Sequence, residues 1–284
     1  MGLRIYKLLL GLCAVIGVEC SLRAATNEVS IFLDRNLENA VRDQVFAKRG
    51  TNSPLTAMDV ATVSTVVGRG RGITNLTGLE HCTALALLDL SGNKITDLSP
   101  LADLKQLQSA TFTSNQIGDV GPLARINALQ YLELSHNQVK DTAPLATLSH
   151  LSSLYLQDNR LTTLGPVTNL TRLTTLYVDG NKLKSLAGLE KIPRLGMLSA
   201  AHNSIEDITP VAALTEPTFL ILAHNRIKDV APLYKALTND LAGNQRFAPF
   251  VRIYLQENPL KRAAKKDLAD LAKRGVKIDP DPIP

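Results

Sequence analysis

The chain has 284 residues, of which 45% are hydrophobic and 20% charged, and its formal net charge is +5. A chain of this length and apolar content can bury a large core, so it does not need disulfides or a metal ion to fold. The charge is modest, whereas a nucleic-acid-binding protein is usually more basic, so we do not expect a nucleic-acid partner.

Residues 1–25 have the layout of a secretory signal peptide. Two basic residues precede an apolar run from Leu8 to Val18. This run is too short to span a bilayer but has the usual length of a signal-peptide core. Cleavage after Ala24 or Ala25 would lower the net charge from +5 to about +3. We therefore predict a secreted or periplasmic protein.

The cysteines agree with this prediction. Cys13 and Cys20 would leave with the signal peptide, so the mature chain would keep only Cys82 and could form no internal disulfide. Cys20 could instead mark a lipoprotein, but the bulky acidic Glu19 stands where the modification site normally has a small residue. No later segment is long and apolar enough to span a membrane, so we expect a soluble mature protein.

Residues 26–62 predict a helical N-terminal cap. The segment 31–46 favours an amphipathic helix with Asp34 as its N-cap and with Leu37, Val41 and Val45 on one face. A second short helix is predicted to begin at Thr56, where Asp59 takes the place of the usual Glu in a capping box.

An asparagine then recurs every 22 residues, at positions 93, 115, 137, 159, 181, 203 and 225. Apolar residues stand eight, five and three positions before each one. In the run YLELSHN, this alternation puts Leu132 and Leu134 on one face of a short strand, and Tyr131 and Glu133 on the other. A single unit cannot bury its apolar edges alone, so the units must stack.

The remainder of each unit predicts a tight turn or short 3-10 segment. Apolar residues return at spacings near three, as in Ile95, Leu98 and Leu101. A proline follows each asparagine by seven positions in most units, and Gly188 replaces it in one. The asparagine side chain both donates and accepts, so we expect it to join the backbones of neighbouring units.

This 22-residue pattern resembles the leucine-rich repeat, and the runs DLSPL and DVAPL are similar to those of bacterial internalins. The resemblance covers about residues 63–260 and begins with a degenerate unit that has Arg71 at the asparagine position. It implies an α/β fold: a right-handed solenoid of about nine rungs, with short parallel strands on its concave face, 3-10 or turn segments on its convex face, and helical caps.

The repeat spacing breaks once near the C-terminus. Asn225 is followed by Asn258, a gap of 33 residues, which places an insertion near residues 238–249. This insertion is either a tolerated surface loop or a protruding contact loop. Residues 261–284 predict a C-terminal cap and tail, in which a basic amphipathic helix turns Leu268 and Leu271 inward.

The solvent-facing strand positions form the candidate binding surface, because tyrosines gather there with other large side chains. β-Propensity alone could also place tyrosines in strands, but a contiguous exposed aromatic patch usually marks an interface. We therefore predict that a protein or peptide, or else a glycan, binds the concave face. The candidate residues are Tyr131, Glu133, Tyr155, Tyr177, Asp179, Met197, Phe219, Ile221, Arg252 and Tyr254. The alternative is a structural component of the cell envelope that associates through its lateral loops or basic C-terminal cap.

No feature predicts catalysis, a cofactor or a metal site. Cys82 falls at a core phase of the repeat, where a thiol is inert. His202 and His224 lie on adjacent rungs and could approach one metal ion, but two ligands make a weak site, and a solvated polar edge is the alternative. The concave face carries a net charge of about −3, which disfavours nucleic acid.

Overall fold

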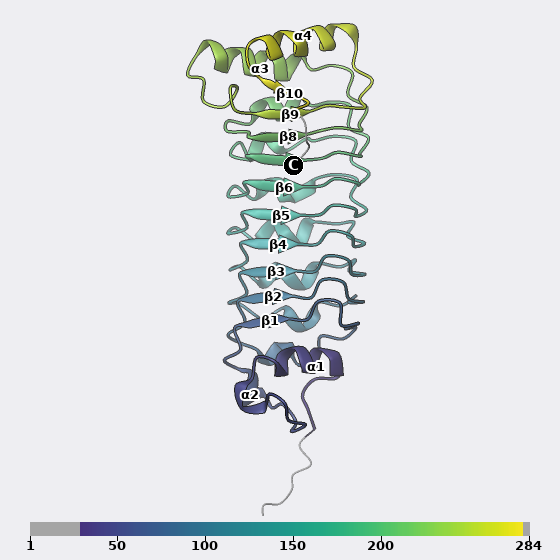
Figure 1. Ribbon diagram of the computed structural model, residues 1–284, viewed down its shortest axis with the longest axis vertical. Helices are drawn as coiled ribbons and strands as arrows, with labels where there is room; N and C mark the ends of the chain where they lie inside the picture. The colour runs from purple at the N-terminus through teal and green to yellow at the C-terminus, as the bar shows by residue number, and fades with distance from the viewer. Residues whose placement is uncertain (1–28, 281–284) are drawn as a thin grey trace, which may run out of the picture.

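The computed structural model describes residues 29–280, so the predicted signal peptide over residues 1–25 lies outside the described part. Ten strands form one parallel sheet in chain order, from β1 to β10. They stack into a single column, with helices at both ends (Figure 1). This architecture confirms the predicted solenoid. No helix within residues 29–280 is long and apolar enough to cross a membrane.

The sheet register reproduces the sequence repeat. From β1 to β8, each residue pairs with the residue 22 positions later, as in Tyr155 and Tyr177. Because the pairs all have the same phase, equivalent side chains of successive units form straight rows along the column. The strands are β1 Thr65–Val67, β2 Leu87–Asp89, β3 Ser109–Thr111, β4 Tyr131–Glu133, β5 Ser153–Tyr155, β6 Thr175–Tyr177, β7 Met197–Ser199, β8 Phe219–Ile221, β9 Arg252–Tyr254 and β10 Lys277–Ile278.

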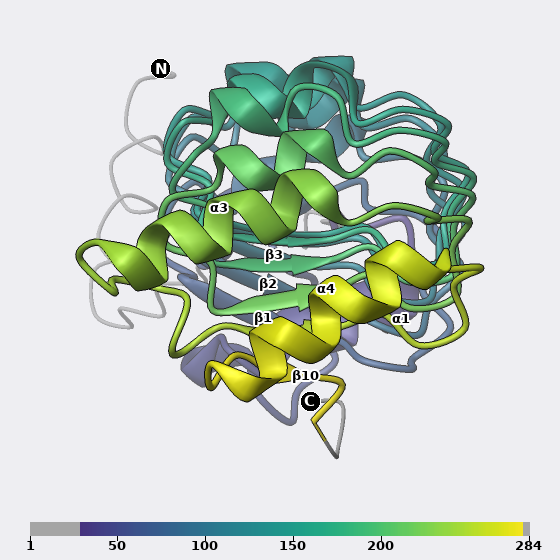
Figure 2. The same ribbon diagram turned by 90° about the horizontal axis from the view of Figure 1, so that it is seen from above.

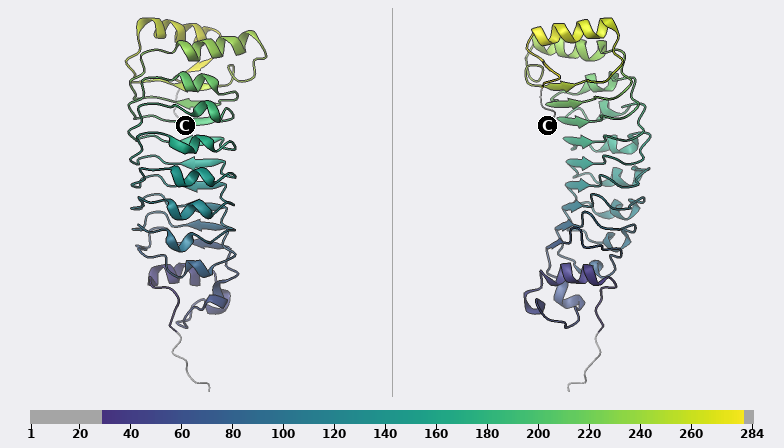
Figure 3. Two further views of the ribbon diagram at one scale, coloured as in Figure 1. Left: turned by 180° about the vertical axis from the view of Figure 1, so that it is seen from behind. Right: turned by 45° about the vertical axis from the view of Figure 1, so that its right-hand side comes forward.

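Short 3-10 helices occupy the opposite side of the column. Five of them carry a proline in their first turn, where the missing N–H would have no helical partner. Figure 3 shows the column curved, with the strands on its concave side. The helices of the repeat region are η2 Leu79–His81, η3 Ser99–Leu101, η4 Gly121–Arg125, η5 Ala143–Thr147, η6 Gly165–Asn169, η7 Leu189–Lys191 and η8 Thr209–Ala213.

The core runs without interruption between these two sides. Leu132, Leu154 and Leu176, which pair across β4, β5 and β6, are all fully buried. Cys82 is fully buried in the same core, as its phase in the repeat predicts. The units are therefore stabilised mainly by contacts with their neighbours, as expected for a stacked repeat.

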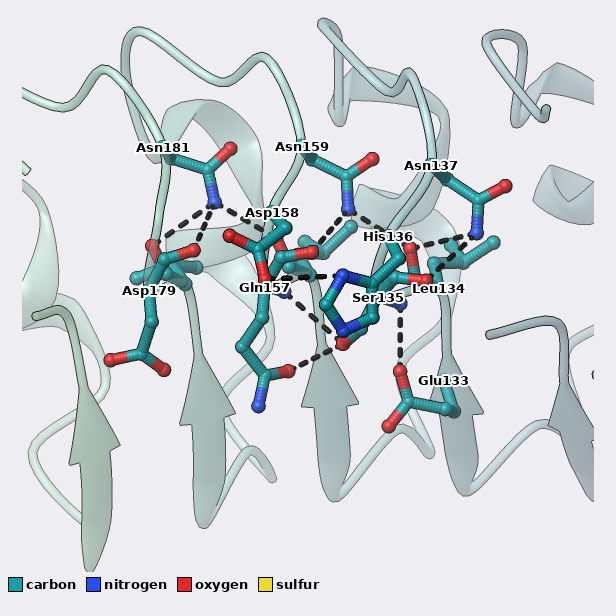
Figure 4. A network of polar contacts seen from close by, with 12 residues as sticks. Glu133, Leu134, Ser135, His136, Asn137, Gln157, Asp158, Asn159, Asp179 and Asn181 are labelled. Atoms are coloured by element: carbon teal, nitrogen blue, oxygen red, sulfur yellow. Dashed lines mark hydrogen bonds and ion pairs between the residues drawn. The ribbon is translucent and has the colours of Figure 1, made fainter. Parts of the chain in front are cut away.

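The recurring asparagines join each unit to the one before it. Asn137 Oδ1 accepts a hydrogen bond from Ile117 N at 2.9 Å, and its Nδ2 donates to Phe112 O, Leu134 O and Ser135 O at 2.9, 3.0 and 3.1 Å. We call the seven asparagines at the 22-residue spacing the asparagine ladder: Asn93, Asn115, Asn137, Asn159, Asn181, Asn203 and Asn225. Figure 4 shows Asn137, Asn159 and Asn181. These contacts confirm the predicted role of the asparagine.

The N-terminal cap consists of α1 Arg35–Arg42, η1 Phe46–Lys48 and α2 Ala57–Val60, so α1 is shorter than the predicted helix over 31–46. Asp34 is the N-cap of α1, as predicted, and its side chain accepts hydrogen bonds from Asn36 N and Leu37 N. Its second oxygen accepts from Thr74 N at 2.8 Å, which ties the cap to the first rung. The predicted capping box at Thr56 is also present.

The C-terminal end differs from the prediction in two places. The inserted residues do not form one loop, because Thr238–Ala242 belong to the helix α3 Ala231–Ala242. The loop after it folds back so that the Asp240 carboxylate accepts from the backbone N of Phe247 and Ala248. The unpredicted strand β10 also continues the sheet beyond β9.

The predicted C-terminal helix is α4 Arg262–Lys273, which buries Leu268 and Leu271. Figure 2 shows α3 and α4 lying across the end of the stack. Tyr234 Oη of α3 donates to Asp270 Oδ2 of α4 at 2.8 Å. The two helices together cover the last rungs, whose apolar side would otherwise face solvent.

Candidate binding surface

Three tyrosines form a continuous aromatic patch on the concave face, and we call Tyr131, Tyr155 and Tyr177 the tyrosine cluster. Tyr155 and Tyr177 pair across β5 and β6, whereas Tyr131 on β4 lies diagonal to Tyr155. The ring centroids of Tyr131 and Tyr155 are 5.3 Å apart, and those of Tyr155 and Tyr177 are 5.1 Å apart. These distances fall in the range of favourable tilted and edge-to-face ring pairs. The rings are half-buried, and burial, followed by the charge of Glu133, raises the pKa of Tyr131 to about 12.

A neighbouring row of large side chains, at the strand position of Tyr131, extends toward the C-terminal end. Met197, Phe219 and Arg252 occupy equivalent positions on β7, β8 and β9. The Arg252 guanidinium carbon lies 5.3 Å from the centre of the Phe219 ring, which is a cation–π contact. The exposed and half-exposed side chains therefore form one amphipathic track along the concave face.

Two candidate residues are not exposed, which corrects the sequence prediction for them. Ile221 is 6% exposed and Tyr254 is fully buried. They form a small apolar cluster with Ala201 and Ala223, against which Phe219 packs. The small alanines leave room for the large Tyr254 ring, and β10 makes β9 an interior strand rather than the last one. Neither side chain can act as a free contact residue in this conformation.

Asp179 lies in a pocket on the concave face, which we call the Asp179 pocket. Its volume is about 300 Å³. Asp179 Oδ1 accepts from Ser199 Oγ at 2.5 Å and from Ala201 N at 2.8 Å. Burial raises the pKa of the Asp179 carboxyl, although these hydrogen bonds oppose the rise. The lining residues are Gln157, Tyr177, Asp179, Ser199, Ala201, His202, Ile221, Ala223 and His224.

His202 and His224 stack in this pocket, with ring centroids 4.1 Å apart and ring planes 12° from parallel. Both residues have positive φ, 52° and 54°, because the position before each ladder asparagine adopts the left-handed conformation. The adjacency predicted from the sequence is therefore correct. Within residues 29–280, no group of three or more His, Cys, Asp or Glu residues is placed to hold a metal ion.

Ser199 and Cys82 are two side chains with nucleophilic atoms. The Ser199 hydroxyl donates its proton to a carboxylate, with no histidine hydrogen-bonded to it to act as a base. Burial raises the pKa of the Cys82 thiol to about 12, which keeps it protonated. Glu133 accepts from Ser135 N at 2.7 Å and keeps its other oxygen available on the concave face (Figure 4).

Sequence reasoning identified Asp179 and Tyr177 but missed Ser199, Ala201, Ala223 and Gln157, which complete the pocket. Ser199 stands four positions before its ladder asparagine, and the other three stand two positions before theirs. The position two before the asparagine also faces the concave side, so the repeat phase could have identified them. The small side chains of Ser199, Ala201 and Ala223 leave the space that forms the pocket.

The sheet, the 3-10 helices and the asparagine ladder together define a leucine-rich-repeat solenoid. Two leucine-rich-repeat family models match the chain, at residues 81–98 and 149–191. Internalin C2 from Listeria monocytogenes is 33% identical, the match covers 72% of this chain and 89% of that one, and the TM-score is 0.69. The chain therefore belongs to the leucine-rich-repeat proteins of the internalin type.

Other solved structures share the fold. An internalin from Listeria monocytogenes, inlF, is 21% identical over 89% of this chain and 97% of that one, with a TM-score of 0.55. The plant peptide hormone receptor RGFR1, solved in complex with RGF2, is 21% identical over 64% of this chain and 30% of that one, with a TM-score of 0.54. None of the curated protein sequences matches this chain.

Proposed function

We propose that this chain is an exported, non-enzymatic binding protein whose concave face holds a protein or peptide partner. The observation that carries the proposal is the tyrosine cluster, in which three rings in contact lie half-exposed in one patch. Aromatic side chains are enriched in interfaces because they bury a large area and lose little conformational entropy. A β-propensity effect alone would not require the tyrosines to occupy one contiguous patch.

The family supports the same proposal. Internalin-like leucine-rich-repeat proteins are generally non-enzymatic binding proteins. The plant receptor with this fold was solved in complex with a peptide hormone, which supports a peptide as one class of partner. The layout of residues 1–25 supports export. A glycan remains a second class of partner, because sugar rings also stack on tyrosines.

Affinity capture with matched variants tests the proposal. The mature chain is immobilised and exposed to the native envelope and secreted fractions, beside a variant with Tyr155→Ala, Tyr177→Ala and Phe219→Ala. The matched control replaces three large apolar side chains that lie outside the tyrosine cluster. They are Phe46, Met58 and Phe250, which are 88%, 88% and 66% exposed. We expect a partner that wild type and the control variant retain and the concave variant loses.

Equal retention by all three proteins would contradict concave-face binding. Digestion of the bound fraction with a protease or a glycosidase then distinguishes a protein partner from a glycan. Loss of assembly on neutralising the exposed basic residues Lys261, Arg262, Lys265 and Lys266, with the concave variant unaffected, would instead favour the structural envelope component.

A further inference from the structure

The Asp179 pocket combines a carboxylate, an aromatic wall and an apolar lining in one small space. Asp179 and the Tyr177 ring lie beside the stacked rings of His202 and His224, while Ala201 and other apolar side chains complete the lining. The volume of about 300 Å³ is enough for one long side chain but not for a whole peptide segment. The pocket opens on the concave face and adjoins the tyrosine cluster through Tyr177.

The two oxygens of Asp179 have different roles. Oδ1 already accepts two hydrogen bonds, from Ser199 Oγ and Ala201 N, which hold the carboxylate in place. No other side chain within the described residues forms a hydrogen bond or ion pair with Oδ2, whereas the Asp179 backbone N–H and the nearby charge of His202 compensate the carboxylate more weakly. Burial raises the pKa of this carboxyl, so its negative charge is only partly compensated by the protein. A cation placed beside Oδ2 would supply the missing compensation.

Asp179 has only one oxygen available to a ligand, and this favours lysine over arginine. A guanidinium group binds a carboxylate best through two parallel hydrogen bonds to both oxygens. Here Oδ1 is saturated, so the geometry suits a donor that needs only Oδ2. A primary ammonium is such a donor, and the four-carbon stem of a lysine can lie against the apolar lining formed by Ala201 and Ala223. The Tyr177 ring offers a further cation–π contact.

We infer that the Asp179 pocket is a subsite that receives a lysine side chain of the bound protein or peptide. The inference rests on the proposed function, because it assigns the chemistry of one anchor of the concave-face partner. Lysine inserts its stem along the alanine lining and places its ammonium at Asp179 Oδ2. The tyrosine cluster holds the neighbouring part of the same partner.

Small lysine derivatives test this subsite without knowledge of the partner. Nα-acetyl-lysine methylamide is titrated into the mature chain at pH 8, and the amide signals of Ala201 and Ala223 are followed by NMR. We expect saturable shifts with a Kd on the order of 1–10 mM, as for a single small anchor. The norleucine analogue has the same stem without the amine and should give no saturable shift, and the arginine analogue should bind more weakly than lysine.

Two variants assign the effect to the carboxylate. Asp179→Asn keeps an oxygen acceptor for Ser199 and Ala201 but removes the charge, and we expect at least about tenfold weaker lysine binding. Glu206→Gln removes one charge from an exposed side chain with no hydrogen bond, so its lysine affinity should change less than about twofold. A third variant, Ala201→Leu, fills the pocket without a change of charge and should also abolish the shifts.

The subsite is refuted if wild type shows no saturable shift, or if Asp179→Asn and Glu206→Gln weaken binding equally. This failure is distinguishable from failure of the proposed function. A captured partner that depends on Tyr155 and Phe219 but not on Asp179 would leave concave-face binding intact and remove only the lysine subsite. Lysine binding in the absence of any partner that depends on the tyrosine cluster would support the subsite and contradict the proposed function.

Discussion

At the residue scale, the asparagine ladder satisfies buried backbone groups of its own unit and of the preceding one. In Asn137→Ala, the buried N–H of Ile117 would lose its acceptor, and the carbonyl of Phe112 would keep Asn115 Nδ2 as its only side-chain donor. We expect a loss of about 1–3 kcal/mol in the free energy of unfolding, measured by urea denaturation. The exposed Asn127 is the matched control, and Asn127→Ala should cost less than about 0.5 kcal/mol. Equal losses would mean that the ladder contacts contribute nothing specific.

Gly188 shows why one unit lacks its proline. Its φ is +101°, which proline cannot adopt, and a Cβ there would come within 2.6 Å of Thr168 Cγ2. Its N–H donates to Glu190 Oε2, and Gly78 in the sequence GLE makes the equivalent bond to Glu80. We expect Gly188→Ala to lower the free energy of unfolding by about 1–3 kcal/mol. Gly118→Ala, with no positive φ and 3.9 Å of clearance, is the control and should be nearly neutral.

The buried carboxylate of Asp179 should make stability depend on pH in an unusual direction. Its folded-state pKa is raised above the ordinary value of 3.8, so the folded state holds this proton more tightly than the unfolded state. The resulting stability is present below 3.8 and is lost as the pH rises through the folded pKa. Relative to Asp179→Asn, wild type should therefore lose stability as the pH rises above about 4.

Urea denaturation of the two proteins at each pH measures this difference. Tyr177, His202 and His224 face the same pocket and are present in both proteins, so the comparison reports the carboxylate together with its interaction with the His202 charge. Glu206→Gln controls for the loss of one negative charge elsewhere on the surface. A wild type that gains stability relative to Asp179→Asn over this range would contradict the raised pKa.

At the scale of elements, the C-terminal cap covers the apolar end of the stack and the edge of the sheet. The α4 helix buries Leu268 and Leu271, and β10 pairs with β9 at the open edge of the sheet. Removing residues 261–284 would expose this apolar end and an unpaired strand, both of which favour association. We expect the truncated chain to form dimers or larger species. Light scattering at the same concentration should show a single species of lower mass for the full mature chain. The variant Lys265→Gln with Lys266→Gln should keep the mass of wild type.

At the scale of the whole molecule, the unbroken register makes each unit removable. Deleting residues 138–159 takes out one complete 22-residue unit and joins Asn137 to Arg160 in the correct phase. We expect a folded, cooperative protein whose urea m-value is lower by about one tenth, because slightly less surface is exposed on unfolding. Deleting only residues 138–148 shifts every later side chain out of phase. Circular dichroism and urea unfolding should show this second variant to be largely unfolded, and equal behaviour of the two deletions would contradict the stacking model.

The repeat phase made most of the column predictable from the sequence. Position relative to the ladder asparagine separated Leu132 from Tyr131, placed Cys82 in the core and brought Tyr155 beside Tyr177. These assignments succeed because each strand pairs with the next in the same register, so a position in one unit has the same surroundings in all units. Asp34 and Thr56 were predictable for a different reason, since a helix N-cap is a local interaction.

Only the tertiary structure decided the features where the repeat stops, and those where side chains of different size adjoin on successive units. The burial of Tyr254, the short strand β10 and the helical start of the insertion in α3 depend on segments that no repeat relates to one another. The Asp179 pocket arises because small residues follow one another at the position that larger side chains occupy elsewhere. The sequence by itself thus determined the scaffold and its concave face, because their contacts repeat, whereas the pocket on that face depends on contacts that occur once.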